Sequence, residues 1–414
     1  MPRRLLCGLA WLLCLTLLLF AAGCNPDSGN TSSESVSSEQ TDTQKTNDNA
    51  VNFVKSIPFR PEAERGVWEK RADLTHSFMR ENFFGKYDMY QNTYPYSETQ
   101  NRQFHYWIQA QVLDSIVDAY IRSGDKQYAQ NAKDLIEAIR IRNGRFLITN
   151  DFYDDMGWLA NAILKLYIAT GDEDLWPDIE YLTNDILSGW NSGFGGGIAW
   201  NKNQPQYKNS PSNGPACILT ARLYQVTGKK EYLDWALKIF EWWDSTLVDH
   251  ETGLVWDGIN RQNDSQIDKD WRFTYCQGVY IGSCVELYRI TKDETYIDKA
   301  IKTADYTINN LVNKDGILQD EGSGDGGAFK GIFCRYFVQL IKTTERNRKE
   351  YCDFLVKNGN VMWSNIQDEN TPIFNTSWSS RPRRGVTLQT QSSGLALLES
   401  LADLYKNGYI SDPQ

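Results

Sequence analysis

Four stretches of the chain repeat one pattern of hydrophobic and polar positions. In each, an apolar run ends in a tyrosine, a corner of the Ser/Thr-Gly type follows, and a second run begins. The tyrosines are Tyr120, Tyr167, Tyr224 and Tyr288, so neighbouring repeats lie 47, 57 and 64 residues apart. Glycine tolerates the left-handed conformation that ends many helices, and an acid beyond the corner suits the positive end of the next helix. The pattern therefore predicts a series of helical hairpins.

The hydrophobic periodicity predicts about twelve helices, which pair into six hairpins. The expected ranges are 62–84, 100–123, 126–141, 155–170, 173–188, 212–227, 230–246, 274–291, 294–311, 328–344, 347–357 and 388–405. Four of them (155–170, 212–227, 274–291 and 328–344) are apolar nearly all round, whereas partners such as 231–243 are amphipathic and suit an outer layer. We expect one all-α domain over residues 55–410, an (α/α)6 barrel with an inner ring of six helices inside an outer ring of six. An open solenoid of the same hairpins is the alternative.

The N-terminal segment has a different character. Arg3 and Arg4 precede an apolar run over 5–20, which is short for a membrane span of about 20 residues. The run ends in Ala-Ala-Gly-Cys, which resembles the lipobox of bacterial lipoproteins and implies cleavage of a signal peptide at 1–23 and lipidation of Cys24. Residues 24–54 are rich in Ser and Thr, which predicts a disordered tether. An uncleaved anchor helix is the alternative. In both cases we expect a cell-envelope protein that faces outside the cytoplasm, contacts the membrane through its N-terminus alone, and is a monomer.

Composition narrows the function. The chain carries 43 Lys+Arg against 53 Asp+Glu, a net charge of -10, which argues against nucleic acid as the partner. Its three histidines (His76, His105 and His250) do not have metal-ligand spacing, so we expect no metal and no other cofactor. Beyond the N-terminal segment lie five cysteines, expected as small buried hydrophobes, although one disulfide among them stays possible. They are Cys217, Cys276, Cys284, Cys334 and Cys352.

Several loops that lead into the predicted inner helices combine glycine with aromatic and short polar residues. They lie at 193–200, 254–259 and 325–330. In a closed ring such loops gather at one face, where flat rings can stack on pyranose faces and polar side chains can bind hydroxyls. This composition favours a sugar-binding surface. The alternative is that these residues only build turns and fill the mouth of the barrel.

Two adjacent carboxylates, Asp154 and Asp155, stand where a loop enters a predicted inner helix, between Tyr153 and Trp158. Acids at a helix start often serve only as N-caps. Glycoside hydrolysis, however, needs two carboxyl groups, and neighbouring residues with Cα atoms about 3.8 Å apart can hold theirs roughly 5–6 Å apart, the retaining spacing. Repulsion between the two favours one ionised and one protonated member.

Seven motifs in order resemble glycoside hydrolase family 76, the endo-α-1,6-mannanases. They are Y-D-D-M-G-W-L-A (153–160), G-G-G-I-A-W (195–200), N-S-P-S-N-G-P-A (209–216), W-D-G-I (256–259), T-Y-C-Q-G (274–278), F-K-G-I-F-x-R-Y (329–336) and L-Q-T-Q-S-S-G-L-A (388–396). The resemblance implies an (α/α)6 barrel and a retaining mechanism without a metal, with Asp154 as the nucleophile and Asp155 as the general acid/base. It also implies substrate-binding roles at Asp257, Trp200, Tyr153, Trp158, Tyr275, Gln277, Phe329, Lys330 and Arg335.

The chain departs from the family pattern at two places. Cys276 stands where the family usually has Asn, and Ala199 where it has a second Trp; a thiol is a poor hydrogen-bond partner for a sugar. We predict a retaining endo-acting α-1,6-mannanase. The alternatives are a transglycosylase or a hydrolase acting on another α-1,6-linked glycan, and a non-catalytic glycan-binding surface lipoprotein, for which the expected sign is loss of one member of the Asp pair.

Overall fold

The computed structural model describes residues 57–413 apart from 145–146 and 384, and twelve α-helices dominate this part of the chain. The helices are α1 (Val67–Asn82), α2 (Tyr106–Ser123), α3 (Lys126–Arg142), α4 (Tyr153–Thr170), α5 (Trp176–Ser188), α6 (Ser210–Thr227), α7 (Lys230–Leu247), α8 (Thr274–Thr291), α9 (Glu294–Asn310), α10 (Gly326–Thr343), α11 (Arg348–Ser364) and α12 (Leu388–Lys406). The predictions for residues 1–23, Cys24 and the tether at 24–54 lie outside the described residues. None of the described helices is long and apolar enough to cross a membrane.

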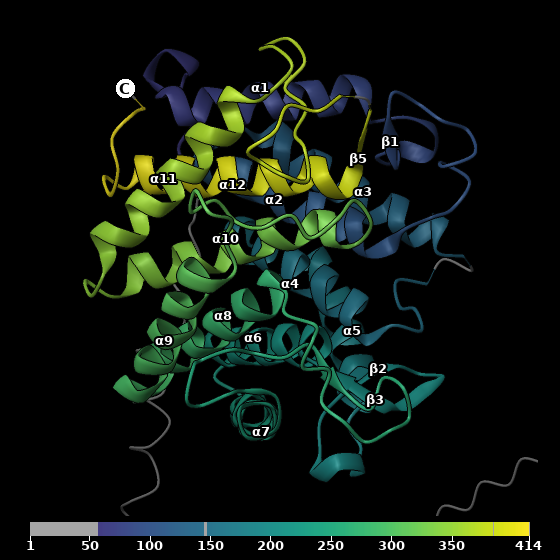
Figure 1. Ribbon diagram of the computed structural model, residues 1–414. Helices are drawn as coiled ribbons and strands as arrows, with labels where there is room; N and C mark the ends of the chain where they lie inside the picture. Colours follow the sequence, from purple (N-terminus) through teal and green to yellow (C-terminus); the bar gives the residue numbers. More distant parts are fainter. Residues whose placement is uncertain (1–56, 145–146, 384, 414) are drawn as a thin grey trace, which may run out of the picture. The chain divides into compact units, whose positions relative to one another are not determined.

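The six even-numbered helices form the inner ring. Each contacts the next in the order α2, α4, α6, α8, α10 and α12, and α12 returns to contact α2 (Figure 1). The odd-numbered helices lie outside, with α3, α5, α7 and α9 each packed on the inner helix that precedes it. The helices α1 and α11 complete the outer layer, since both pack on α12. The fold is therefore the predicted (α/α)6 barrel.

The repeated tyrosine corners end four of the inner helices as predicted. The residue after the corner takes the left-handed conformation in each case, and its N–H donates to the carbonyl of the repeated tyrosine at 2.7–2.8 Å. These residues are Gly124, Gly171, Gly228 and Lys292, with φ between 60° and 70°. Lysine pays a small conformational cost at this position that glycine avoids.

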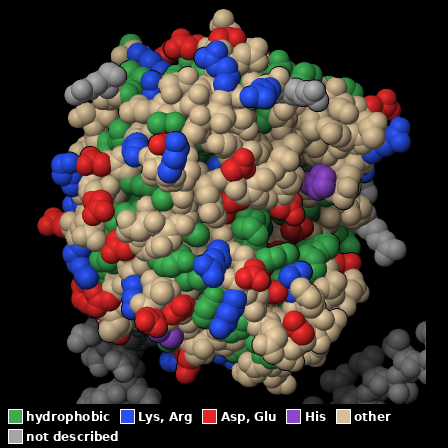
Figure 2. All heavy atoms as spheres, viewed as in Figure 1, with side chains coloured by type: hydrophobic (Ala, Val, Ile, Leu, Met, Phe, Trp, Pro, Cys, Tyr) green, Lys and Arg blue, Asp and Glu red, His purple; other side chains and the backbone are tan. Residues whose placement is uncertain are grey.

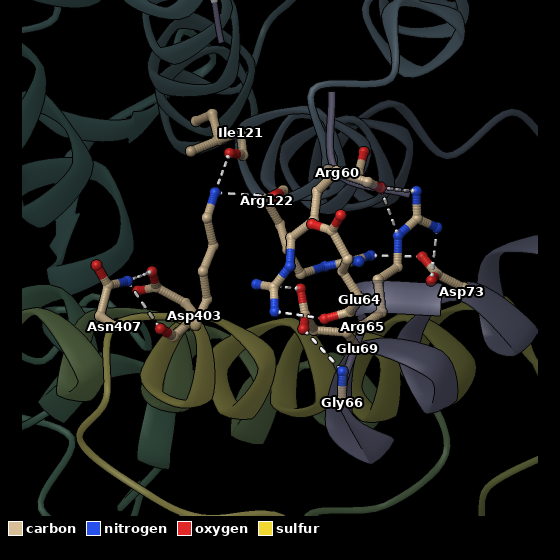
Figure 3. A network of polar contacts seen from close by, with 12 residues as sticks. Arg60, Glu64, Arg65, Gly66, Glu69, Asp73, Ile121, Arg122, Asp403 and Asn407 are labelled. Carbon is tan, nitrogen blue, oxygen red and sulfur yellow. Dashed lines mark hydrogen bonds and ion pairs between the residues drawn. The ribbon is translucent and has the colours of Figure 1, made fainter. Parts of the chain in front are cut away.

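A network of ion pairs and hydrogen bonds closes the ring between α2 and α12. Arg122, at the end of α2, donates to Glu399 of α12 at 2.9 Å. It also donates to Asp73 of α1 at 2.8 Å (Figure 3). Lys406 of α12 donates to the carbonyls of Ile121 and Arg122 at 3.0 and 2.8 Å. Because these contacts join the first and last inner helices, the open solenoid is excluded.

Small residues let the inner helices approach closely. A Cβ atom added at Gly278 of α8 would lie 2.6 Å from the backbone of Phe333 on α10, and one at Gly282 would lie 2.5 Å from the ring of Tyr336. One predicted boundary was wrong: the helix expected to end at 357 continues to Ser364. It passes through Gly359, whose missing side chain makes room for Leu401 and Trp68.

Short strands, which the periodicity did not predict, line one end of the barrel. They are β1 (Thr93–Tyr94) paired with β5 (Val386–Thr387), and an antiparallel sheet of β2 (Ala199–Asn201), β3 (Gln204–Asn209) and β4 (Gly258–Ile259). The five cysteines of the described chain are all buried and all free, which agrees with their expected packing role and excludes a disulfide among them.

Candidate active site

A cleft of about 890 Å³ opens at the end of the barrel where the inner helices begin. Its wall includes residues at or next to the first turns of five inner helices, namely His105 for α2, Asp154 and Asp155 for α4, Asn209 for α6, Tyr275 for α8 and Gly326 for α10. Figure 2 shows acidic side chains set among hydrophobic ones in a hollow on this face. Since helix N-termini carry partial positive charge, this end of the barrel favours anionic groups and developing negative charge.

The adjacent carboxylates occupy the first turn of α4 and are half-buried at the cleft. Asp154 Oδ1 accepts the N–H of Asp155 at 2.9 Å, and its Oδ2 accepts the indole N–H of Trp200 at 3.0 Å. Asp155 Oδ2 accepts the side-chain N–H of Asn150 at 3.0 Å. Asp154 thus satisfies one free N–H of the helix start, as an N-cap would, while Asp155 bonds to no backbone donor of its helix.

The two carboxyls differ in acidity. Burial raises the pKa of Asp154 to about 7, against the lowering effect of its two hydrogen-bond donors. Burial and the neighbouring Asp154 charge raise the pKa of Asp155 well above its usual value. Asp154 is therefore the first of the pair to ionise, and Asp155 keeps its proton over a wider range of pH.

A third carboxylate, Asp257, lies buried in the cleft wall just before β4. Its Oδ1 accepts the hydroxyl of Tyr275 at 2.6 Å, and its Oδ2 accepts the hydroxyl of Tyr207 at 3.0 Å. The thiol of Cys276 lies 3.6 Å from Oδ1 and is fully buried. Cys276 therefore faces Asp257 behind the wall and is not among the residues that line the cleft.

Comparison with known proteins decides the family. The family model described as glycosyl hydrolase family 76 matches residues 68–410, which is nearly all of the described chain. The chain belongs to glycosyl hydrolase family 76.

Solved structures of similar proteins extend over the whole barrel. An inactive variant of the α-1,6-mannanase GH76A of Salegentibacter sp. HEL1_6, in complex with α-1,6-mannotetrose, is 36% identical with a TM-score of 0.78; the match covers 81% of this chain and 99% of that chain. The Lin0763 protein of Listeria innocua is 38% identical with a TM-score of 0.78, and the match covers 81% of this chain and 97% of that chain.

Curated relatives match less of their length. The mannan endo-1,6-alpha-mannosidase DFG5 of Candida albicans is 24% identical over 282 residues, which is 59% of this chain and 61% of the relative. The mannan endo-1,6-alpha-mannosidase DCW1 of Candida glabrata is 25% identical over 195 residues, which is 43% of this chain and 44% of the relative. The matched part of this chain thus spans about half of these relatives.

Aromatic rings form the remaining walls of the family 76 cleft. The ring of Trp200 meets those of Phe152 and Tyr207 edge-on, at centroid distances of 5.2 and 5.6 Å. In another part of the wall Tyr275 stacks on Phe329, with centroids 3.8 Å apart and an interplanar angle of 4°. Five residues that the motifs single out, Asp257, Trp200, Trp158, Tyr275 and Phe329, thus line the cleft together with the Asp pair.

The other four predicted substrate-binding residues do not line the cleft. Tyr153 packs its ring against Gly189. The side-chain amide of Gln277 accepts the N–H of Val255 through its oxygen and donates to the Val255 carbonyl through its nitrogen. Two more point elsewhere: Lys330 is buried, with its Nζ bonded to the Thr376 carbonyl and 4.6 Å from the Trp378 ring centroid, and Arg335 pairs with Asp114 at 3.0 Å. These four side chains support the frame of the barrel.

Several lining residues were not predicted. Tyr207, Asn150 and Glu321 approach the site from loops or from β3 and belong to none of the quoted motifs. Glu321 accepts the N–H and the hydroxyl of Thr274 at 2.7 and 2.6 Å, so it caps α8 at the cleft edge. Others had a usable sequence signal: Phe152 lies one residue before the Asp motif, and Asn209 and Pro211 lie inside a quoted motif. Within the described residues, no group of three or more His, Cys, Asp or Glu could hold a metal ion.

Proposed function

We propose that this chain is an endo-acting glycoside hydrolase that cleaves α-1,6-linked mannan with retention of configuration. The observation that carries the proposal is the Asp154–Asp155 pair, the only Asp-Asp sequence in the chain, which stands in the cleft with its two acidities separated. The variant of the Salegentibacter α-1,6-mannanase in which two adjacent aspartates are replaced by alanine is inactive, and this supports a catalytic role for the pair here.

In the proposed first step, the ionised carboxylate of Asp154 attacks the anomeric carbon of the bound mannosyl unit. The protonated carboxyl of Asp155 gives its proton to the glycosidic oxygen as the C–O bond breaks, and the leaving chain departs as an alcohol. The Asp154 assignment follows from its two hydrogen-bond donors, which favour the ionised form.

In the second step, Asp155 is ionised and takes a proton from water, which attacks the anomeric carbon from the side the leaving group vacated. The bond to Asp154 breaks, mannan with a free reducing end is released, and both carboxyls return to their starting states. We assign Asp257 to substrate binding, because it lies in the same wall with its orientation fixed by Tyr207 and Tyr275.

The test is the pattern of products. The purified protein is incubated with linear α-1,6-mannan and, in parallel, with an α-1,6-glucan, and the products are separated by chromatography over time. An endo-mannanase releases a mixture of mannan oligosaccharides that shortens with time and leaves the glucan intact. Free mannose as the first product, cleavage of the glucan alone, or binding of mannan without any cleavage would each contradict the proposal.

The pH dependence should report the two carboxyls. Activity requires Asp154 ionised and Asp155 protonated, so kcat/KM should rise with pH through about 7, the pKa of Asp154, and fall again at higher pH as Asp155 loses its proton. Initial rates on a soluble α-1,6-mannan between pH 4 and pH 10, at concentrations well below KM, measure this profile. A rate that is flat across the neutral range would contradict the assignment.

Trp200→Phe tests which carboxyl is responsible for the acid limb, the rise of kcat/KM with pH on the acidic side of the profile. The substitution keeps a ring but removes the N–H that lowers the pKa of Asp154, so the acid limb should move to higher pH. Trp235→Phe, on the outer helix α7, is the matched control and should leave the limb in place.

We also propose that the protein acts outside the cytoplasm as a monomer held by a lipid on Cys24, on the strength of its N-terminal sequence pattern. In a bacterial host fed a labelled fatty acid, the full chain should incorporate the label. Cys24→Ser should incorporate none and should appear in the soluble fraction. Equal labelling of the two would contradict the lipid anchor.

A further inference from the structure

A second, smaller hollow of about 80 Å³ lies beside the catalytic cleft. The two share three wall residues, Gln103, Phe104 and His105, which precede α2. Two consecutive residues at the end of α3 face different hollows: Arg142 lines the small hollow, and Asn143 lines the cleft. The small hollow therefore adjoins the cleft, and the three shared residues form the wall between them.

Two tyrosine rings stand at this hollow and are open to solvent. Tyr87 is 56% exposed and Tyr96 is 61% exposed, and both line the hollow. The backbone at Tyr87 takes a positive φ of 71°, a conformation that costs a non-glycine residue energy. The side chains of Lys86 and Arg142 lie 4.8 and 5.0 Å from the centroid of its ring and hold it in place.

The floor of the hollow offers hydrogen-bonding groups. Gln91 lines it, and its Oε1 is buried without a hydrogen-bond partner among the described residues. Gln103, on the wall between the two hollows, is exposed. The accessible amide of Gln103 can both donate to and accept from a sugar hydroxyl.

We propose that this hollow, which we call the Tyr87–Tyr96 groove, binds further neutral sugar units of the same α-1,6-linked chain whose scissile bond lies in the cleft. The inference rests on the proposed function. Exposed rings offer faces for the C–H surface of a pyranose, and the amides offer partners for its hydroxyls. Because the groove lies next to the cleft and outside it, a chain too short to leave the cleft cannot reach it. The groove therefore favours long substrates over short ones.

The experiment compares a short and a long substrate on the same variants. Wild type, Tyr96→Ala and Tyr87→Ala/Tyr96→Ala are assayed on α-1,6-mannotetraose and on linear α-1,6-mannan. We expect the double variant to lose about tenfold in kcat/KM on mannan, chiefly through KM, and to match wild type on the tetraose; loss of two aromatic contacts accounts for a change of this order. Tyr96→Phe, which keeps the ring, should behave as wild type on both.

Tyr181→Ala is the matched control, since Tyr181 is a similarly exposed tyrosine on the outer helix α5 and lines neither hollow. It should match wild type on both substrates. Equal rates of wild type and double variant on mannan, or equal losses on both substrates, would overturn the groove while leaving the proposed function intact. Wild-type protein that cleaves neither substrate would instead contradict the proposed function, and binding of mannan by the double variant with undiminished affinity would then overturn the groove as well.

Discussion

Asp154→Asn is expected to abolish mannan hydrolysis, lowering kcat on the order of 10⁴-fold or more, because it removes the proposed nucleophile. An amide of the same shape cannot attack the anomeric carbon as a carboxylate does. It can still accept the N–H of Asp155 and the indole N–H of Trp200, so the local structure should persist.

The measurement is the rate of appearance of reducing ends from linear α-1,6-mannan, together with the melting temperature of each protein. Asp234→Asn is the matched control: it changes an exposed aspartate on α7 that pairs only with Lys230 on the same helix, and it should retain full activity. An Asp154→Asn protein that folds and keeps near-normal activity would refute the nucleophile assignment.

Asp155→Asn is expected to lower activity on mannan by about 10²- to 10⁴-fold, the range for loss of a general acid. The loss should depend on the leaving group. A sugar alcohol needs a proton to depart, whereas an activated phenol on an aryl α-mannooligosaccharide leaves without one. The variant should therefore form the mannosyl-enzyme from the aryl substrate and then stall, since no general base remains to activate water.

Azide separates the two steps, because it attacks the intermediate without giving up a proton. Added azide should accelerate turnover of the aryl substrate by Asp155→Asn and yield a mannosyl azide of retained α configuration. Wild type should show no such acceleration. If mannan and the aryl substrate slow equally and azide changes nothing, Asp155 is not the acid/base.

The same substitutions have a predictable effect on stability. Folding raises the pKa of both carboxyls, so the folded state binds more protons than the unfolded chain. Stability then falls as pH rises from the unfolded pKa of about 4 through about 7, where Asp154 ionises in the folded protein. The Asn variants lack this penalty and should melt at or above the wild-type temperature at neutral pH. Retained stability with lost activity would separate a catalytic role from a structural one.

Some residues of the motifs line the cleft and others do not, and helix geometry explains the difference. A helix turns by about 100° per residue, so side chains two positions apart point to nearly opposite sides. Tyr275 therefore faces the cleft while Gln277 turns to the backbone of Val255. Lys330 follows Phe329 by one position and turns away as well. Arg335 lies six residues beyond Phe329 on the same helix, which is about 9 Å towards the far end of the barrel.

Residues that reach the cleft from loops lay beyond sequence reasoning for another reason. Tyr207 and Glu321 are separated from the Asp pair by many residues of chain, and no local periodicity links them. Their positions follow from the sheet of β2, β3 and β4 and from the loop that caps α8. Cys276 is a similar case, because only the packing shows that it faces Asp257 and not the cleft.

The sequence alone determined the local structure and the chemistry at hand. Apolar periodicity and the glycine corners specified helical hairpins, because hydrogen bonds within a helix and its capping depend on residues a few positions apart. The adjacent aspartates Asp154 and Asp155 supplied a pair of carboxyls, because consecutive residues stay close together in any fold. Closure of the ring was decided only in the tertiary structure: Arg122 and Glu399 meet across 277 residues, a contact that packing of all six hairpins brings about. The cleft, the separated acidities and the groove beside it follow from that closure, since burial and proximity between distant segments exist only in the folded chain.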